Sequence, residues 1–127
     1  NYTSQQLLSE WNNSYENEGY VDGGYTIYNK TLAPNIYFVV PTNGSGVIVD
    51  GKLDAIVVVE GGKVNKDVTV GMTYQEIKDK IGASIKPADD KTEEDCTVAV
   101  IEGNDYIITV TFDGAGGKSS RAMIKSK

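Results

Sequence analysis

The chain has 127 residues, with 18 acidic and 12 basic side chains, a formal net charge of −6, no histidine and a single cysteine. This length fits one domain or two very small ones. The absence of histidine excludes catalytic and zinc sites built on imidazole, and one cysteine excludes an intramolecular disulfide. The acidic excess disfavours nucleic-acid binding, and the apolar runs are too short to cross a membrane, so we expect no nucleic-acid partner and no membrane insertion.

Two segments, 70 residues apart, carry the same helix-start signal. Thr3 is followed three residues later by Gln6, and Thr73 is followed three residues later by Glu76. This is the capping box, in which two side chains satisfy backbone N–H groups at the start of a helix. The repeat indicates two helices at matching positions in two halves of the chain.

Each predicted helix carries an apolar stripe that would pack against a sheet. Residues spaced four apart define the stripe, namely Leu7 with Trp11 and Ile77 with Ile81. Leu8 and Tyr15 would broaden the first stripe, so we expect that helix to continue until it frays near residues 17–19. Gly82 should end the second helix.

Strand-like runs rich in Val, Ile, Tyr, Phe and Thr follow each helix, separated by Gly- and Asn-containing turns typical of antiparallel hairpins. The runs are residues 24–28, 35–40, 47–50 and 53–60, and then 96–102, 105–112 and 119–125. A weaker match of Gly51-Lys52 to Gly117-Lys118 extends the repeat. The pattern predicts an α+β fold of two tandem helix-plus-β-hairpin units, 1–65 and 66–127, that share an antiparallel sheet with the helices on one face.

Residues 68–82 read Val-Thr-Val-Gly-Met-Thr-x-x-Glu-Ile-x-x-x-Ile-Gly. This motif resembles the Gly-Met-Thr signature of the β-lactamase inhibitor protein family, itself a tandem of two helix-plus-sheet units. It is also similar to small bacterial outer-membrane lipoproteins of the SmpA/OmlA type. The resemblance implies a Thr-capped helix on a short antiparallel sheet, an extracellular or cell-envelope location and a protein-binding sheet. It does not imply inhibition of β-lactamase, because Cys96 alone cannot form the disulfides of the inhibitor family.

Three segments could suggest chemistry, and each has a simpler interpretation. The acidic run 89–95 lacks the spacing of an EF-hand calcium site and fits a solvated hairpin loop. The Gly-rich run 113–118 lacks both the phosphate-loop pattern and a following helix. Cys96 alternates with apolar residues, which is typical of a buried, inert thiol. We therefore expect no catalytic residue, no metal site, no cofactor and no enzymatic activity.

Strand alternation predicts which side chains face outward. In run 105–112, Tyr106, Ile108, Val110 and Phe112 form the better core face, which turns Ile107, Thr109 and Thr111 outward. In run 35–40 both faces are apolar, so the register stays open, and we favour an outward Tyr37. The candidate partner-binding residues are Tyr37, Val39, Ile107, Thr109 and Met123.

The predicted function is a non-catalytic extracytoplasmic module that recognises a protein partner through an open sheet face. Tyrosine, with eight residues, supports this interpretation, because tyrosine is enriched at protein interfaces. The alternative is a structural or envelope-assembly module of a secreted protein or lipoprotein, with a lipid anchor ahead of Asn1. The identity of the partner and the oligomeric state stay open.

Overall fold

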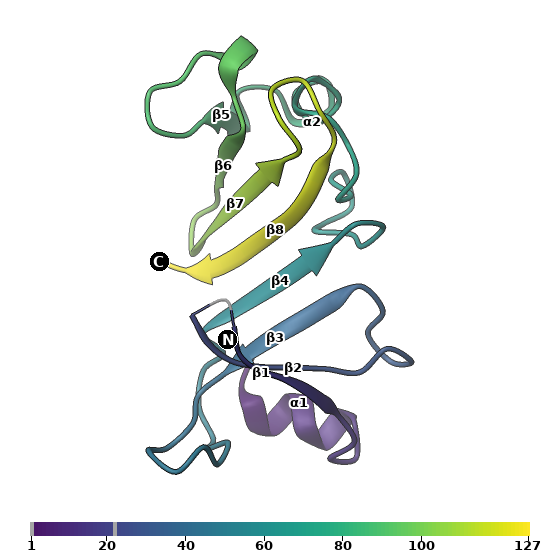
Figure 1. The fold of residues 1–127 in the computed structure, drawn as a ribbon, viewed down its shortest axis with the longest axis vertical. Helices are drawn as coiled ribbons and strands as arrows, with labels where there is room; N and C mark the ends of the chain where they lie inside the picture. Colours follow the sequence, from purple (N-terminus) through teal and green to yellow (C-terminus); the bar gives the residue numbers. More distant parts are fainter. Residues whose placement is uncertain (1, 22) are drawn as a thin grey trace. The chain divides into compact units, whose positions relative to one another are not determined.

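The computed structural model describes residues 2–21 and 23–127 (Figure 1). These residues form two α-helices, two short 3-10 helices and eight β-strands, and the paired strands run antiparallel. The predicted α+β class with antiparallel strands is confirmed. A sheet shared by two repeated units, with both helices on one face, stays a prediction.

The chain divides into two compact units, Asn1–Val57 and Val58–Lys127, called the N-terminal unit and the C-terminal unit below. The division falls inside β4 (Ala55–Val59). The boundary between residues 65 and 66, which comes from the sequence repeat, stays a prediction. No helix within residues 2–21 and 23–127 combines the length and the apolar character needed to span a membrane.

The N-terminal unit begins with α1 (Ser4–Glu10), whose predicted capping box is present. Thr3 Oγ1 accepts the Gln6 N–H at 3.2 Å, and Gln6 Oε1 accepts the Thr3 N–H at 2.9 Å. The predicted continuation to residues 17–19 is wrong. Asn12 and Asn13 adopt positive φ angles of 51° and 57°, which end the helical path because L-residues do not propagate that conformation.

After α1 the unit continues with β1 (Glu16–Val21), β2 (Gly24–Tyr28) and β3 (Ile36–Val40), which neighbour one another in chain order. The predicted strand at 47–50 is absent, because the chain there forms only an isolated bridge between Thr42 and Ile48. The core of the unit joins the helix to two strands through Leu7, Trp11, Ile27, Phe38 and Val40. The Trp11 and Phe38 rings meet edge to face, with centroids 5.3 Å apart.

The C-terminal unit contains α2 (Tyr74–Ile81), β5 (Ile85–Pro87), β6 (Val98–Glu102), β7 (Tyr106–Phe112) and β8 (Ser119–Ser126). Its strand order is β8-β7-β6-β5, and 3-10 turns cover Gly82–Ser84 and Glu93–Asp95. The predicted capping box of Thr73 and Glu76 is present, and Gly82 ends the helix with a φ of 64°. Tyr74 lies against Phe112, with ring centroids 6.2 Å apart, so α2 packs on the buried face of β7.

Each helix start is held to a Gly-Lys segment by a matching backbone contact. Thr3 forms an antiparallel bridge with Lys52, and Thr73 forms an antiparallel bridge with Lys118. In each unit the capping threonine bridges the lysine of the Gly-Lys pair, and the sequence repeat matches these two Gly-Lys pairs to each other. The matching bridges are observations about each unit separately, and they agree with the expected repeat.

A buried serine strengthens each contact between a helix start and its Gly-Lys segment, and we call this arrangement a helix clamp. In the N-terminal unit the serine belongs to the helix, and in the C-terminal unit it belongs to the segment that the helix start contacts. In the N-terminal unit, the Ser4 hydroxyl donates to the Val49 carbonyl at 2.7 Å and accepts the Gly51 N–H at 3.1 Å. In the C-terminal unit, the Ser119 hydroxyl of β8 donates to the Met72 carbonyl at 2.7 Å and accepts the Gly71 N–H at 2.8 Å. Hydrogen bonding explains how both hydroxyls tolerate burial.

Candidate functional site

The C-terminal unit has one buried sheet face and one open face. Along β7, Ile108, Val110 and Phe112 are buried, whereas Ile107 is exposed and Thr109 is half-buried. This alternation is the predicted one, because a strand directs successive side chains to opposite faces. Tyr106 departs from the prediction of a core position.

Tyr106 begins β7 with an exposed side chain whose ring covers Gly103. A Cβ atom added at Gly103 would lie 2.4 Å from the Tyr106 ring, so this packing requires glycine. The ring therefore closes the β6–β7 turn, away from the helix-packed core.

Strand register brings three of the five predicted partner-binding residues together on the open face. Thr109 pairs with Met123 of β8 on one side and with Val100 of β6 on the other. Ile107 lies two residues before Thr109 on the same strand and therefore on the same face. Directly paired residues have neighbouring side chains, so Ile107, Thr109 and Met123 form one contiguous surface.

The other two predicted residues, Tyr37 and Val39, lie on β3 of the N-terminal unit. The Tyr37 ring is half-buried and lies 5.0 Å from the ring of Tyr28. Val39 is only 1% exposed, and a Cβ atom added at Gly24 would lie 2.5 Å from Val39 Cγ1. Burial removes Val39 from the accessible surface, so it does not belong to the candidate site.

One ion pair borders the open face. Lys127 Nζ lies 2.8 Å from Glu102 Oε2, and both side chains are exposed. The hydrogen bond and the positive charge of Lys127 lower the pKa of the Glu102 carboxyl, and Lys86 adds to this effect. Glu102 pairs with Ile107 in the β6–β7 register, which places the carboxylate beside the centre of the face.

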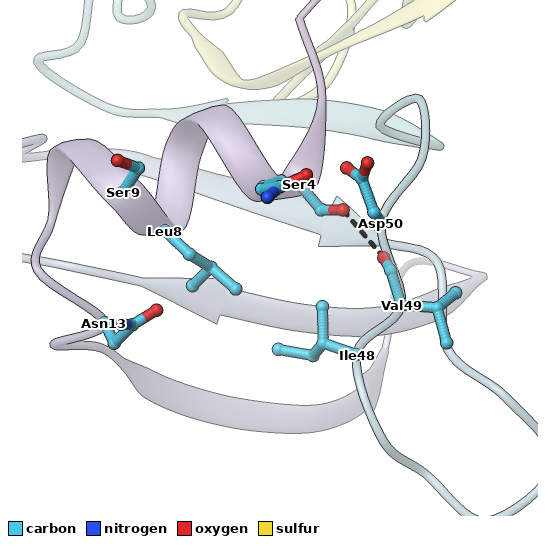
Figure 2. Close-up of a pocket in the computed structure, with 8 residues that line it drawn as sticks. Ser4, Leu8, Ser9, Asn13, Ile48, Val49 and Asp50 are labelled. Atoms are coloured by element: carbon cyan, nitrogen blue, oxygen red, sulfur yellow. Dashed lines mark hydrogen bonds between the residues drawn. The ribbon is translucent and has the colours of Figure 1, made fainter.

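A groove of about 330 Å³ in the N-terminal unit is the second candidate site (Figure 2). One wall is α1 and the following turn, and the other is the extended segment 48–50. Figure 2 shows the side chains of Leu8 and Ile48 pointing toward one another across the groove. The polar rim includes Gln5, Ser9, Asn13 and Asp50.

The sequence did not predict this groove, because its walls come from segments about forty residues apart. The nearest sequence signal was the Asn43-Gly44 turn, which predicts a reversal before residue 48 but not its contact with α1. The groove offers an apolar floor and hydrogen-bonding side chains, which suits binding of a side chain from a partner.

The remaining segments that could suggest chemistry have structural roles. Cys96 is buried, as predicted, its Sγ donates to the Val98 carbonyl at 3.2 Å, and burial raises the pKa of the thiol. In the acidic run, Thr92 caps the 3-10 turn of Glu93–Asp95. Within residues 2–21 and 23–127, no group of three or more carboxylate or cysteine side chains is arranged to hold a metal ion.

Comparison of the chain with models of known families, with curated proteins and with solved structures yields no match. The resemblance of residues 68–82 to the β-lactamase inhibitor protein family therefore stays a prediction.

Proposed function

We propose that the chain is a non-catalytic binding module that recognises a protein partner through the open face of its C-terminal unit. The observation that supports this function most is the contiguous surface of Ile107, Thr109 and Met123 on a sheet whose other face is buried. Antiparallel sheets need only one buried face for stability, so the second face is available for binding.

The chemistry of this surface suits a protein more than a small molecule. Its centre combines aliphatic, thioether and hydroxyl groups, which can bury apolar area while satisfying a few hydrogen bonds. Methionine and β-branched side chains present broad contact area, and Ile107 is 36% exposed. An extracytoplasmic location is part of the proposal, and it rests on the motif in residues 68–82.

A photo-crosslinking experiment tests the proposal. The photoreactive residue p-benzoylphenylalanine replaces Ile107 in the full chain, and the matched control carries it at Val47, an exposed aliphatic position of the N-terminal unit. We expect a discrete protein adduct from position 107 in extracts of the source organism, and none of the same mass from position 47.

A second variant tests whether the crosslinked protein binds at the open face of the C-terminal unit. Thr109→Asp places a charge at the centre of the surface, where loss of a central contact weakens binding by about 30-fold or more. Because Thr109 is half-buried on a solvated face, the variant should retain its circular dichroism spectrum. Absence of an adduct from position 107, or an adduct that Thr109→Asp leaves unchanged, would refute the proposed function.

A further inference from the structure

A small pocket in the N-terminal unit is lined by aromatic and polar residues. Its volume is about 190 Å³, which is below the range of about 300–1,000 Å³ usual for pockets that enclose drug-sized ligands. The lining comes from residues 14–16, which lead into β1, and from residues 28–31, which end β2 and form the following turn. The pocket therefore has room for one small ring and not for a long ligand.

The side chain of Asn29 joins the two walls of this pocket. Its Nδ2 donates to the Ser14 carbonyl at 3.0 Å, and its Oδ1 accepts the N–H groups of Thr31 and Leu32 at 3.1 and 2.9 Å. These bonds hold the turn after β2 against the segment that leads into β1. Because the walls are already joined, binding of a ligand costs little ordering of the chain. The Asn29 amide builds the pocket, and the contacts with a ligand come from other side chains.

Two tyrosines give the pocket an aromatic surface. Tyr15 is 39% exposed and lines the pocket together with the half-buried Tyr28. The Tyr28 ring packs against the Tyr37 ring, with centroids 5.0 Å apart, and this contact fixes its orientation. The face of an aromatic ring is electron-rich, so it attracts C–H groups that carry a slight positive charge. The pocket therefore suits a ligand that presents C–H groups on one face.

The polar groups of the pocket balance in charge. Among the described residues that line it, the charged ones are Glu16 and Lys30. Glu16 pairs with Tyr28 in the β1–β2 register, so the two side chains lie next to each other on one face of the sheet. The Lys30 ammonium lies 5.7 Å from the centre of the Tyr28 ring, near the limit of about 6 Å for a cation–π contact. This contact occupies no hydrogen-bond acceptor, so the ammonium can still donate to a ligand.

We propose that this pocket binds one neutral sugar ring, a pyranose that is either free or the end of a glycan. The axial C–H groups of the pyranose pack on Tyr15 and Tyr28, and its hydroxyls donate to Glu16 and accept from Lys30. A charged ligand fits less well, because it would be repelled by one of these two groups. The site belongs to the N-terminal unit, so this inference does not rest on the protein-binding function proposed for the C-terminal unit.

Two-dimensional NMR of the backbone amides in the full chain tests the inference. The probes are methyl β-D-glucopyranoside, methyl β-D-galactopyranoside and methyl α-D-mannopyranoside. The matched control ligand is sorbitol, which carries similar hydroxyls without a ring. We expect at least one glycoside to give saturable shifts at residues 14–16 and 28–31, with a Kd of about 1 mM, the strength of an ordinary single-ring ligand. Sorbitol should give no saturable shift there.

Three variants assign the binding to this pocket. Tyr15→Ala removes one ring, and Lys30→Met removes the ammonium while it keeps the aliphatic stem. Each should weaken binding about five-fold or more. The matched control is Tyr20→Ala, since Tyr20 is a 64% exposed tyrosine of β1 outside the pocket. Binding by this control should stay within about two-fold of the unmodified chain.

The inference is overturned if no glycoside gives saturable shifts at the pocket, or if sorbitol gives the same shifts. It is also overturned if Tyr15→Ala and Lys30→Met bind as well as Tyr20→Ala does. Tighter binding of adenosine, a ligand with a flat aromatic ring, than of every glycoside would have the same consequence. The tetrasaccharide of the sugar that binds separates the two sources of the ring. Tighter binding than the methyl glycoside supports the end of a glycan, and equal or weaker binding supports a free sugar.

Discussion

Replacing Ser119 with alanine tests the helix clamp of the C-terminal unit. The hydroxyl is 1% exposed, donates to the Met72 carbonyl and accepts the Gly71 N–H at 2.8 Å. In the variant the Met72 carbonyl keeps a partner, because the Ser119 backbone N–H donates to it at 2.9 Å. The Gly71 N–H loses its acceptor, so the cost comes mainly from one poorly solvated donor.

The expected destabilisation is the cost of leaving the Gly71 N–H without an acceptor. An unsatisfied buried donor costs about 1–3 kcal/mol, so Ser119→Ala should lower the free energy of unfolding by about 2 kcal/mol. The neighbouring Ser120 is the matched control. Its half-buried hydroxyl makes a longer bond, 3.3 Å, to the Thr111 carbonyl, and Ser120→Ala should cost about 0.5 kcal/mol.

Urea unfolding followed by far-ultraviolet circular dichroism measures both variants. The midpoint should fall in Ser119→Ala with an unchanged denaturant slope, which indicates lost stability without a change in the exposed surface. If Ser119→Ala and Ser120→Ala have the same unfolding free energy within about 0.5 kcal/mol, the clamp does not stabilise the unit and the reasoning is wrong.

Two further predictions concern packing and charge. Gly24→Ala should destabilise the chain by about 1–3 kcal/mol, because the new Cβ would lie 2.5 Å from Val39 Cγ1. Adding Val39→Ala should recover part of that loss in a double-mutant cycle, and strictly additive effects would contradict the clash. The Glu102 carboxyl, whose pKa is lowered mainly by its hydrogen bond to Lys127, should titrate closer to its ordinary pKa in Lys127→Met, as followed by NMR. The contribution of this pair to stability is complete above the ordinary carboxyl pKa and is lost as the pH falls through the lowered pKa. If Glu102 titrates at the same pH in Lys127→Met as in the unmodified chain, the pairing is ruled out.

Local signals predicted the elements whose chemistry is local. Both capping boxes and the Gly82 helix end depend on residues within one turn, and all are present. The clean alternation of β7 also predicted which of its faces is open. In β3 every residue is apolar or aromatic, so the sequence shows no alternation between apolar and polar side chains, and both Phe38 and Val39 are buried. The sequence could not predict that, because each of these side chains is covered by residues distant in the chain.

The elements that sequence reasoning missed have weak local signals. β1 contains Glu16, Asn17, Glu18 and Gly19, shows no alternation in burial, and has an irregular register between Asn17 and Gly19. Its strand conformation comes from pairing with β2, and edge strands of this kind tolerate charged residues. The groove beside α1 was missed for the same reason, since only tertiary contacts bring segment 48–50 to the helix.

The opposite origin of the two clamp serines limits how parts of the chain could be exchanged. The residue after the capping threonine is Ser4 in α1 but Tyr74 in α2. The residue after the bridged lysine is Leu53 in the N-terminal unit but Ser119 in the C-terminal unit. A hybrid that joined α1 to the start of β8 would place two hydroxyls at one clamp, and the reciprocal hybrid would have none. The two halves are therefore not interchangeable modules, and recombination between them would yield one crowded and one deficient product.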